Sequence, residues 1–207
     1  MLKLKKLKKR LRLIQSQYVD KGKSQLRIIA GDRKGLPLKS LKGENTRPTS
    51  DKVKESVFNM IGPFFTGGIV VELFGGSGAL SLEALSRGAD EAFVFEKDRA
   101  ACEIIRSNVE KCRYQEFVHI QQTDARNALK VLERNGKQID YLFLDPPYAE
   151  EKYYELAGAI VDANLLTDRA VIVCEYDKKT NLPGAFGEFK LSRNNTYGNI
   201  AISIYEK

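Results

Sequence analysis

A strand, a glycine-rich loop and a helix follow one another directly in residues 69–87, and this unit constrains the fold more than any other part of the chain. Residues 69–74 are mostly β-branched or apolar, which predicts a short buried strand. Three glycines and a serine follow at residues 75–78, and residues 79–87 predict a helix with Gly88 as its C-terminal cap. Such a unit is the first turn of a Rossmann-like α/β domain, in which the loop backbone and the helix N-terminus hold a ligand.

The glycine spacing argues against a dinucleotide and for a methyl donor. The dinucleotide pattern G-x-G-x-x-G/A, begun at Gly76, requires Gly or Ala at the position of Ser81. The pattern that fits has an acid at the end of the strand and is similar to motif I of S-adenosylmethionine-dependent methyltransferases. A carboxylate there can accept a hydrogen bond from the donor's ammonium group, which a dinucleotide lacks. A glycine turn without a ligand is the alternative, but we expect donor contacts from Glu72, Phe74, Gly76, Ser77 and Gly78.

Two further strands end in acidic residues that suit the rest of such a donor. Residues 92–95 are apolar and lead into Glu96, which lies 18 residues after Gly78, and a ribose-binding acid is expected about 20 residues after the loop. Residues 117–121 predict a third strand. Asp124 follows it in a position to accept from an adenine amine, although Asp is also common in turns. Acids after three successive strands meet at the carboxyl edge, where open α/β sheets bind ligands.

An acid, two prolines and a tyrosine end the next apolar run. Residues 141–144 predict a buried strand, and Pro146 and Pro147 cannot donate ladder hydrogen bonds, so the backbone must leave the sheet there. Asp145 and the carbonyl of Pro146 suit the hydrogens of an exocyclic amine, and the ring of Tyr148 suits stacking on a base. We therefore predict that Asp145, Pro146, Pro147 and Tyr148 hold a planar base. A proline turn with a packed tyrosine is the alternative interpretation.

Together these segments resemble a class I methyltransferase, and more narrowly the bacterial family that methylates the guanine N2 of small-subunit (16S) ribosomal RNA. The resemblance covers about residues 26–207 and is most specific in residues 47–60. It rests also on residues 27–31, 72–78, 145–148 and 197–199. Gly75 departs from the family pattern, which often has Ala or Ser there.

The resemblance implies an α/β, Rossmann-like fold with a seven-stranded, mostly parallel sheet, an antiparallel last strand and helices on both faces. A basic N-terminal extension precedes this domain. From the residues themselves we expect a short hairpin at residues 26–38, a helix from about Asp51 to Ile61, and a closing pair of strands at residues 186–191 and 200–205. The implied cofactor is S-adenosyl-L-methionine, with Arg47 and Thr49 also lining its pocket. The implied partner is ribosomal RNA or the assembling small ribosomal subunit. The candidates for phosphate contacts, each equally well explained as a solvated surface residue, are Lys34, Lys39, Arg47, Lys52 and Lys54.

The net charge of +7 is unevenly distributed along the chain. Residues 1–25 carry +8 and residues 26–60 carry +4, so the remaining residues carry −5. This asymmetry predicts one side that faces a polyanion. The chain has no run of 18 apolar residues and no secretory signal pattern, so we expect no membrane span. We also expect a cytoplasmic protein with reduced thiols and no metal site, because His119 is the only histidine and no metal-ligand spacing joins Cys102, Cys112 and Cys174.

Residues 1–25 form a basic extension to the expected methyltransferase domain at residues 26–207. Four apolar residues fall on one helical stripe among lysines and arginines: Leu4, Leu7, Leu11 and Ile14. A basic amphipathic helix can bind RNA phosphates or lie on an anionic membrane, and the segment can equally come from an upstream start codon. The sequence does not fix the methylated guanine or the oligomeric state, and a monomer is expected.

Two other functions are compatible with the same motifs. A DNA adenine-N6 methyltransferase shares the pattern at residues 145–148, but it usually carries an added recognition region. A non-catalytic RNA-binding protein with a relic donor pocket is a third possibility. Against that possibility stand the intact acids at Glu72, Glu96, Asp124 and Asp145.

Overall fold

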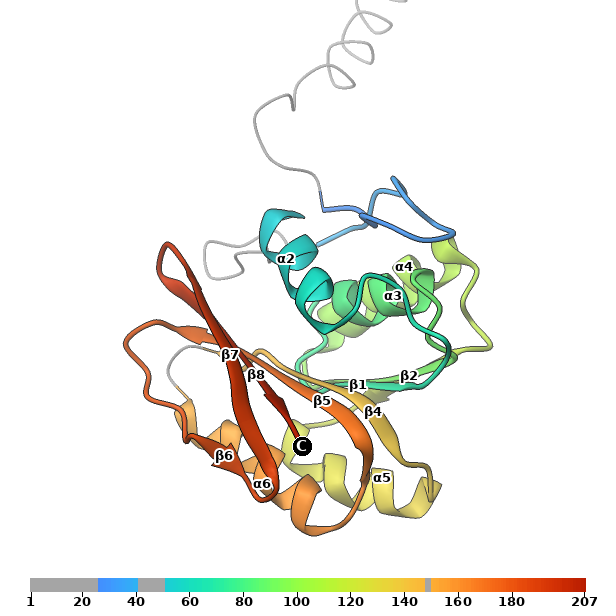
Figure 1. The fold of residues 1–207 in the computed structure, drawn as a ribbon. Helices are drawn as coiled ribbons and strands as arrows, with labels where there is room; N and C mark the ends of the chain where they lie inside the picture. The colour runs from blue at the N-terminus through green and yellow to red at the C-terminus, as the bar shows by residue number, and fades with distance from the viewer. Residues whose placement is uncertain (1–25, 41–50, 148–149) are drawn as a thin grey trace, which may run out of the picture.

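A single eight-stranded sheet forms the centre of the computed structural model, which describes residues 26–40, 51–147 and 150–207 (Figure 1). The strand order is β3-β2-β1-β4-β5-β8-β7-β6. The first five strands in this order are parallel, and β8 is antiparallel to both β5 and β7. The strands are β1 (Ile69–Glu72), β2 (Glu91–Glu96), β3 (Val118–Gln122), β4 (Ile139–Leu144), β5 (Leu166–Asp177), β6 (Ala185–Phe186), β7 (Phe189–Tyr197) and β8 (Ile200–Glu206).

Helices cover both faces of the sheet, with α2, α3 and α4 on one side and α5 and α6 on the other (Figure 1). Strands covered on both faces need apolar residues at nearly every position, which explains the continuous apolar runs in β1, β2 and β4. The helices are α2 (Asp51–Ile61), α3 (Ala79–Ser86), α4 (Arg99–Cys112), α5 (Ala128–Asn135) and α6 (Glu155–Asp162), with short 3₁₀ turns η1 (Ala125–Asn127) and η2 (Glu151–Tyr154).

The predicted fold class is confirmed, with one strand more than expected. The seven strands of the Rossmann-like pattern are present, and the last strand, β8, is antiparallel to β5. The additional strand, β6, arises because a turn divides the segment at residues 186–191, which had been predicted as one strand. Phe186 pairs with Phe189 across this turn, and Gly187 has a φ of +56°, a left-handed conformation that glycine adopts at little cost.

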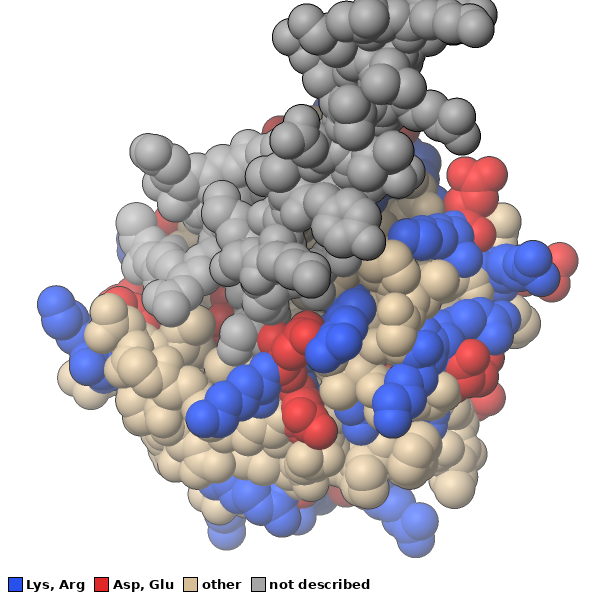
Figure 2. Space-filling model, turned by 90° about the horizontal axis from the view of Figure 1, so that it is seen from above, with Lys and Arg blue, Asp and Glu red and all other residues tan. Residues whose placement is uncertain are grey.

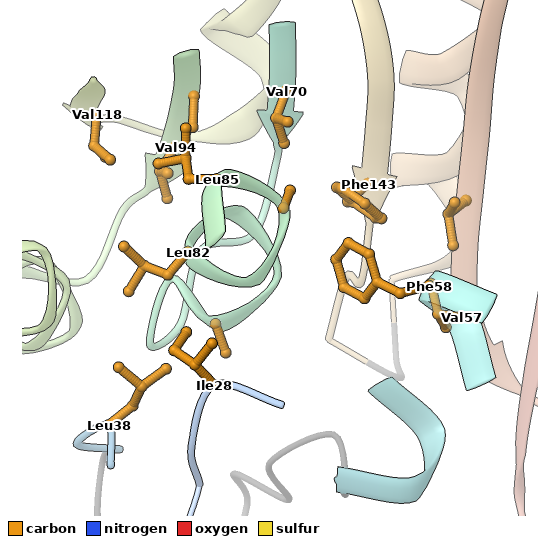
Figure 3. Close-up of a cluster of buried hydrophobic side chains, with 14 of the residues drawn as sticks. Ile28, Leu38, Val57, Phe58, Val70, Leu82, Leu85, Val94, Val118 and Phe143 are labelled. Carbon is orange, nitrogen blue, oxygen red and sulfur yellow. The ribbon is translucent and has the colours of Figure 1, made fainter. Parts of the chain in front are cut away.

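Residues 26–40 form the predicted hairpin, which packs on α3 and α4. Arg27 and Pro37 form an antiparallel bridge. Ile28 is fully buried, and Figure 3 shows its side chain pointing toward Leu82 of α3. The hairpin therefore extends the hydrophobic core on the α2–α4 side of the sheet.

Helix α2 begins and ends where the sequence predicted, at Asp51 and Ile61. Its inward face rests on the sheet through Phe58, whose ring centroid lies 5.9 Å from that of Phe143 on β4 (Figure 3). In the described part of the chain, no helix is long and apolar enough to cross a membrane, and no group of three or more His, Cys, Asp or Glu is arranged to hold a metal ion.

Candidate active site

The loop after β1 turns back sharply against the sheet before α3 begins. The Gly78 amide donates to the Gly75 carbonyl oxygen at 2.6 Å, and the Gly75 amide donates to Phe95 of β2 at 2.9 Å. Gly76 and Gly78 have φ values of +53° and +72°, which a residue with a Cβ rarely adopts. Gly76 is exposed at the carboxyl edge of the sheet, so a ligand can approach the loop backbone from that side.

Gly75 fits this position because it lacks a side chain. A Cβ there would lie 2.4 Å from Cγ1 of Val94 and 2.9 Å from Cδ1 of Ile105. In this chain, the branched side chains of Val94 and Ile105 fill the space that the Cβ of an Ala or Ser at position 75 would need.

Glu72, the last residue of β1, is buried and turned toward the start of α3. Its Oε2 accepts hydrogen bonds from the backbone amide of Ser81 at 3.0 Å and from the Ser81 hydroxyl at 2.5 Å. Burial raises the pKa of Glu72 to about 7; the Ser81 hydrogen bonds oppose this rise, and the nearby Glu96 adds to it. Contact with a donor ammonium group stays a prediction, and Ser81 already engages one oxygen of this carboxylate.

Glu72 is expected to make the protein less stable as the pH rises. Its carboxyl is easier to ionise in the unfolded chain, with a pKa of 4.5, than in the folded protein, so stability is full below pH 4.5 and falls as the pH rises to about 7. The loss amounts to about 3 kcal/mol. Glu72→Gln should remove this fall, so that the variant gains stability over the wild type between pH 5 and pH 8 in urea unfolding. Glu55→Gln, which removes an exposed carboxyl from α2, is the control. If Glu72→Gln stabilised the protein equally at pH 5 and at pH 8, the result would contradict the expectation.

Glu96, the last residue of β2, faces the glycine loop. Its Oε2 accepts from the Gly76 amide at 2.9 Å, and its Oε1 accepts from the Asp98 amide at 2.8 Å. The carboxylate thus lies beside the loop, as a contact to vicinal ribose hydroxyls requires. Its role in binding a ribose is still a prediction.

Asp124 lies at the start of η1, where a tyrosine connects it to the glycine loop. Two side-chain hydrogen bonds from Arg126, at 2.8 and 2.9 Å, hold the pKa of Asp124 below its usual range. The Tyr153 hydroxyl also donates to Asp124 at 3.2 Å, and the Tyr153 ring meets Phe74 edge-on with centroids 4.9 Å apart. Tyr153 therefore connects two predicted donor contacts, Phe74 and Asp124. No sequence pattern around Tyr153 predicted this role.

Asp145 leaves the sheet between two other acids. It follows Leu144 of β4, which pairs with Cys174 of β5, and the residue after Cys174 is the buried Glu175. Glu72 ends β1, the strand on the other side of β4. Burial, together with the nearby carboxylates of Glu175 and Glu72, raises the pKa of Asp145 well above its usual range. Three acids thus meet at the carboxyl ends of β1, β4 and β5.

The structure describes only part of the predicted base-binding segment at residues 145–148. Pro146 is buried and Pro147 is exposed. Tyr148, Arg47 and Thr49 lie outside the described residues, so their predicted contacts with the base and the donor stay predictions.

Lys54 was predicted to contact phosphate, and this prediction was wrong. Its side chain is fully buried, with Nζ 3.3 Å from Oε2 of Glu83 and donating to the carbonyl oxygen of Arg27. Burial lowers the pKa of Lys54, and Glu83 opposes that effect. The physical reason is helical spacing, since position 54 shares the inward face of α2 with Val57 and Phe58.

The other described candidates for phosphate contacts, Lys34, Lys39 and Lys52, are exposed. Figure 2 shows the face above α2 and the hairpin, where Lys and Arg side chains lie among Asp and Glu side chains. Lys39 is beside the glycine loop, because Asn108 of α4 donates to the carbonyl oxygens of both Lys39 and Ser77 at 2.9 Å. Asn108 is fully buried, and no sequence pattern marked it. Lys34 sits in the turn of the hairpin.

The chain is similar to known proteins over most of its length. Residues 26–206 match the family described as "Conserved hypothetical protein 95". The Bacillus subtilis protein YlbH is 40% identical over 182 residues, which are 88% of this chain and 99% of YlbH. The Escherichia coli protein named ribosomal RNA small subunit methyltransferase D is 32% identical over 190 residues, covering 90% of this chain and 92% of its own.

A solved structure shares the same fold. A conserved hypothetical protein of Streptococcus pyogenes superposes with a TM-score of 0.70 at 36% identity, covering 75% of this chain and 96% of its own. With this coverage and identity, the chain belongs to the family described as "Conserved hypothetical protein 95", the family of the E. coli methyltransferase.

Proposed function

We propose that the chain transfers a methyl group from S-adenosyl-L-methionine to the exocyclic N2 of a guanine in small-subunit ribosomal RNA. The observation that carries this proposal is the meeting of two sites at one sheet edge. The glycine loop follows β1 and Asp145 follows β4, and these two strands are directly paired. The name of the E. coli relative supports ribosomal RNA as the substrate, which also favours a cytoplasmic site of action.

The described residues around the loop fit such a donor. Gly76 and Gly78 leave the loop backbone open, and Glu96 offers a carboxylate that suits two vicinal hydroxyls. Phe74 and Asp124, joined by Tyr153, offer an aromatic edge and a carboxylate for an aromatic amine. When bound, the sulfonium group supplies an activated methyl carbon, so the protein does not need a strong base.

Asp145 and the carbonyl of Pro146 accept the two hydrogens of the guanine amine. These bonds raise the electron density on nitrogen, whose lone pair is otherwise conjugated into the ring, and orient it. The bound donor would supply its methyl carbon to this nitrogen and would leave as a neutral thioether. Asp145 or water takes the proton that the methylated nitrogen loses. Alignment of nitrogen, carbon and sulfur is a positioning effect, with a ceiling of about 7–11 kcal/mol in well-oriented reactions.

A tritiated-methyl assay tests the proposal with three acceptors: immature small ribosomal subunits, naked small-subunit ribosomal RNA and DNA. Label is expected in the subunits or the RNA. Label found only in DNA would overturn ribosomal RNA as the substrate and favour an adenine-N6 methyltransferase. Binding of the donor without transfer to any acceptor would favour a non-catalytic RNA-binding protein.

Lys39 and Lys52 are expected to contribute phosphate contacts, because unstacking a base costs a few kcal/mol and stacking on one aromatic ring returns only about 1–3 kcal/mol. Replacing both with Gln should weaken RNA binding and lower the slope of log affinity against log salt by roughly 2. The control is Lys130→Gln with Arg134→Gln, which removes two exposed cations from α5 on the opposite side of the sheet. Equal salt slopes for the two double variants in filter binding would exclude this role.

A further inference from the structure

We propose that Glu175 accepts the N1–H of the target guanine and thereby excludes purines that lack this hydrogen. The inference rests on the proposed function, because it concerns the same base at the same sheet edge. It adds a specificity-determining residue on β5, a strand that none of the motifs singled out above includes.

The sheet register brings Glu175 beside Asp145. Leu144 pairs with Cys174, and each of the two acids follows one member of this pair. Neighbouring strands lie about 4.8 Å apart. Two carboxylates at this spacing suit one edge of a guanine, where the ring N1–H and the exocyclic amine are adjacent.

The alternation of side chains directs Glu175 toward α2 and α3. On β5, Val173 belongs to the core on the α2–α4 side, and Cys174 belongs to the core on the α5–α6 side. Because successive strand residues point to opposite faces, Glu175 shares the face of Val173. By the same alternation on β1, Glu72 shares the face of Val70.

Glu175 borders a small cavity under the two helices. The cavity has a volume of about 10 Å³, and the other described residues that line it are apolar: Val57, Leu80, Phe143, Leu144, Val173 and Ile202. The space is too small to enclose a purine, so a bound guanine would present only its N1 edge to the carboxylate. The Tyr154 hydroxyl donates to the backbone oxygen of Glu175 at 2.6 Å, which fixes the end of β5. The charge of Glu175 also helps to raise the pKa of Asp145, so the two carboxyls lie within electrostatic range.

The chemistry of the purine edge makes such an acid selective. Guanine presents hydrogens at both N1 and N2, and two carboxylates can accept one from each. Adenine and 2-aminopurine carry a bare N1 whose lone pair would face the Glu175 carboxylate. A buried site that hydrogen-bonds a substrate N–H can reject an analogue without it by about 10⁴–10⁵-fold. Asp145 alone provides no such discrimination, because it recognises only the amine.

The test compares guanine with 2-aminopurine, which keeps the 2-amino group but has no N1–H. The methylated guanine is first mapped by mass spectrometry of the RNA product, and the same RNA is then made by splinted ligation with either base at that position. The wild type is expected to prefer guanine in kcat/KM by about 1,000-fold or more. Equal rates on the two RNAs would overturn the proposal without any variant being made.

2-Aminopurine lacks the O6 oxygen of guanine as well as the N1–H, so either difference could cause a preference for guanine. Glu175→Gln shows which one is responsible, because it changes only the contact with N1. The Gln amide can donate to a bare N1 or accept from an N1–H, so the preference for guanine should fall by about 100-fold or more. Donor binding, measured by calorimetry with S-adenosylhomocysteine, should stay within about twofold. Ile202→Val, on the apolar wall of the same cavity, is the control and should change both rates equally.

The outcomes distinguish this inference from the proposed function. A wild type that methylates neither RNA refutes the proposed function. A wild type that methylates guanine, together with a Gln variant that binds donor normally and keeps the full preference for guanine, refutes only the role of Glu175.

Discussion

Asp145→Ala is expected to lower methyl transfer to ribosomal RNA by about 10²–10⁴-fold, the range for loss of a positioned general base. In the proposed function, Asp145, which follows β4, accepts a hydrogen from the guanine amine, whereas the glycine loop that holds the donor follows the neighbouring strand β1. Affinity for S-adenosylhomocysteine should therefore change by less than about threefold. Single-turnover transfer of a tritiated methyl group measures the first quantity, and calorimetry measures the second. Transfer within a factor of two of the wild type would show that this carboxylate has no catalytic role.

Asp145→Asn distinguishes the hydrogen bond from the charge. The Asn carbonyl can still accept an amine hydrogen, so the loss should be smaller than for Ala. Burial and the nearby Glu175 and Glu72 raise the pKa of Asp145, so its ionised form appears only above the ordinary carboxyl range. The wild-type rate should therefore rise with pH through that raised pKa, and the Asn variant should lack this rise. Identical pH profiles would show that proton acceptance by Asp145 does not limit the rate.

Glu83→Ala is expected to destabilise the protein by about 3–5 kcal/mol, as loss of one partner from a buried ion pair does. The fully buried Glu83 carboxylate faces two buried cations, with Arg87 Nε at 2.8 Å and Lys54 Nζ at 3.3 Å. It also accepts from the backbone amides of Ile29 at 2.7 Å and Ala30 at 2.9 Å. The Ala variant would leave both cations without this counterion and both amides without this acceptor. Urea unfolding measures the change.

The exposed ion pair of α4 provides a matched control for Glu83. Arg106 and Glu103 are 2.8 Å apart and about half exposed, so Glu103→Ala should cost less than about 1 kcal/mol. Because Glu83 joins the hairpin and α2 to α3, hydrogen exchange in the hairpin at residues 26–40 should accelerate more in the Glu83 variant than exchange in the strands of the sheet. A Glu83 variant no less stable than the Glu103 variant would contradict the structural role assigned to this cluster.

The parallel part of the sheet and its ligand edge could be predicted because both leave a local signal. Strands β1, β2 and β4 contain short apolar runs, and Glu72, Glu96 and Asp145 stand where these runs end. The residues after two of these strands also predicted where the chain leaves the sheet, since glycines follow β1 and prolines follow β4. The two-residue β6 was not predicted, because pairing across the Gly187 turn depends on neighbouring strands rather than on a local apolar pattern.

Contacts between distant segments could not be predicted. Lys54 looked like a surface lysine because its acidic partner, Glu83, is 29 positions away and on another helix. Asn108 and Tyr153 were missed for the same reason, since their bonds to Ser77 and Asp124 depend on how helices and turns pack at the sheet edge. Glu175 resembled one more polar residue at the end of a strand, and only the strand register makes it a neighbour of Asp145.

The central claim is that a methyl donor and a guanine amine meet where β1 and β4 end, and the chemical identity of the product tests it most directly. Small-subunit RNA is incubated with the protein and S-adenosyl-L-methionine carrying an isotopic methyl label, then digested to nucleosides and separated by liquid chromatography with mass detection. The labelled nucleoside is predicted to be N2-methylguanosine, and it should be lost with Asp145→Ala. Label in N6-methyladenosine or in a ring-carbon product, or label that persists in the Ala variant, would contradict the account.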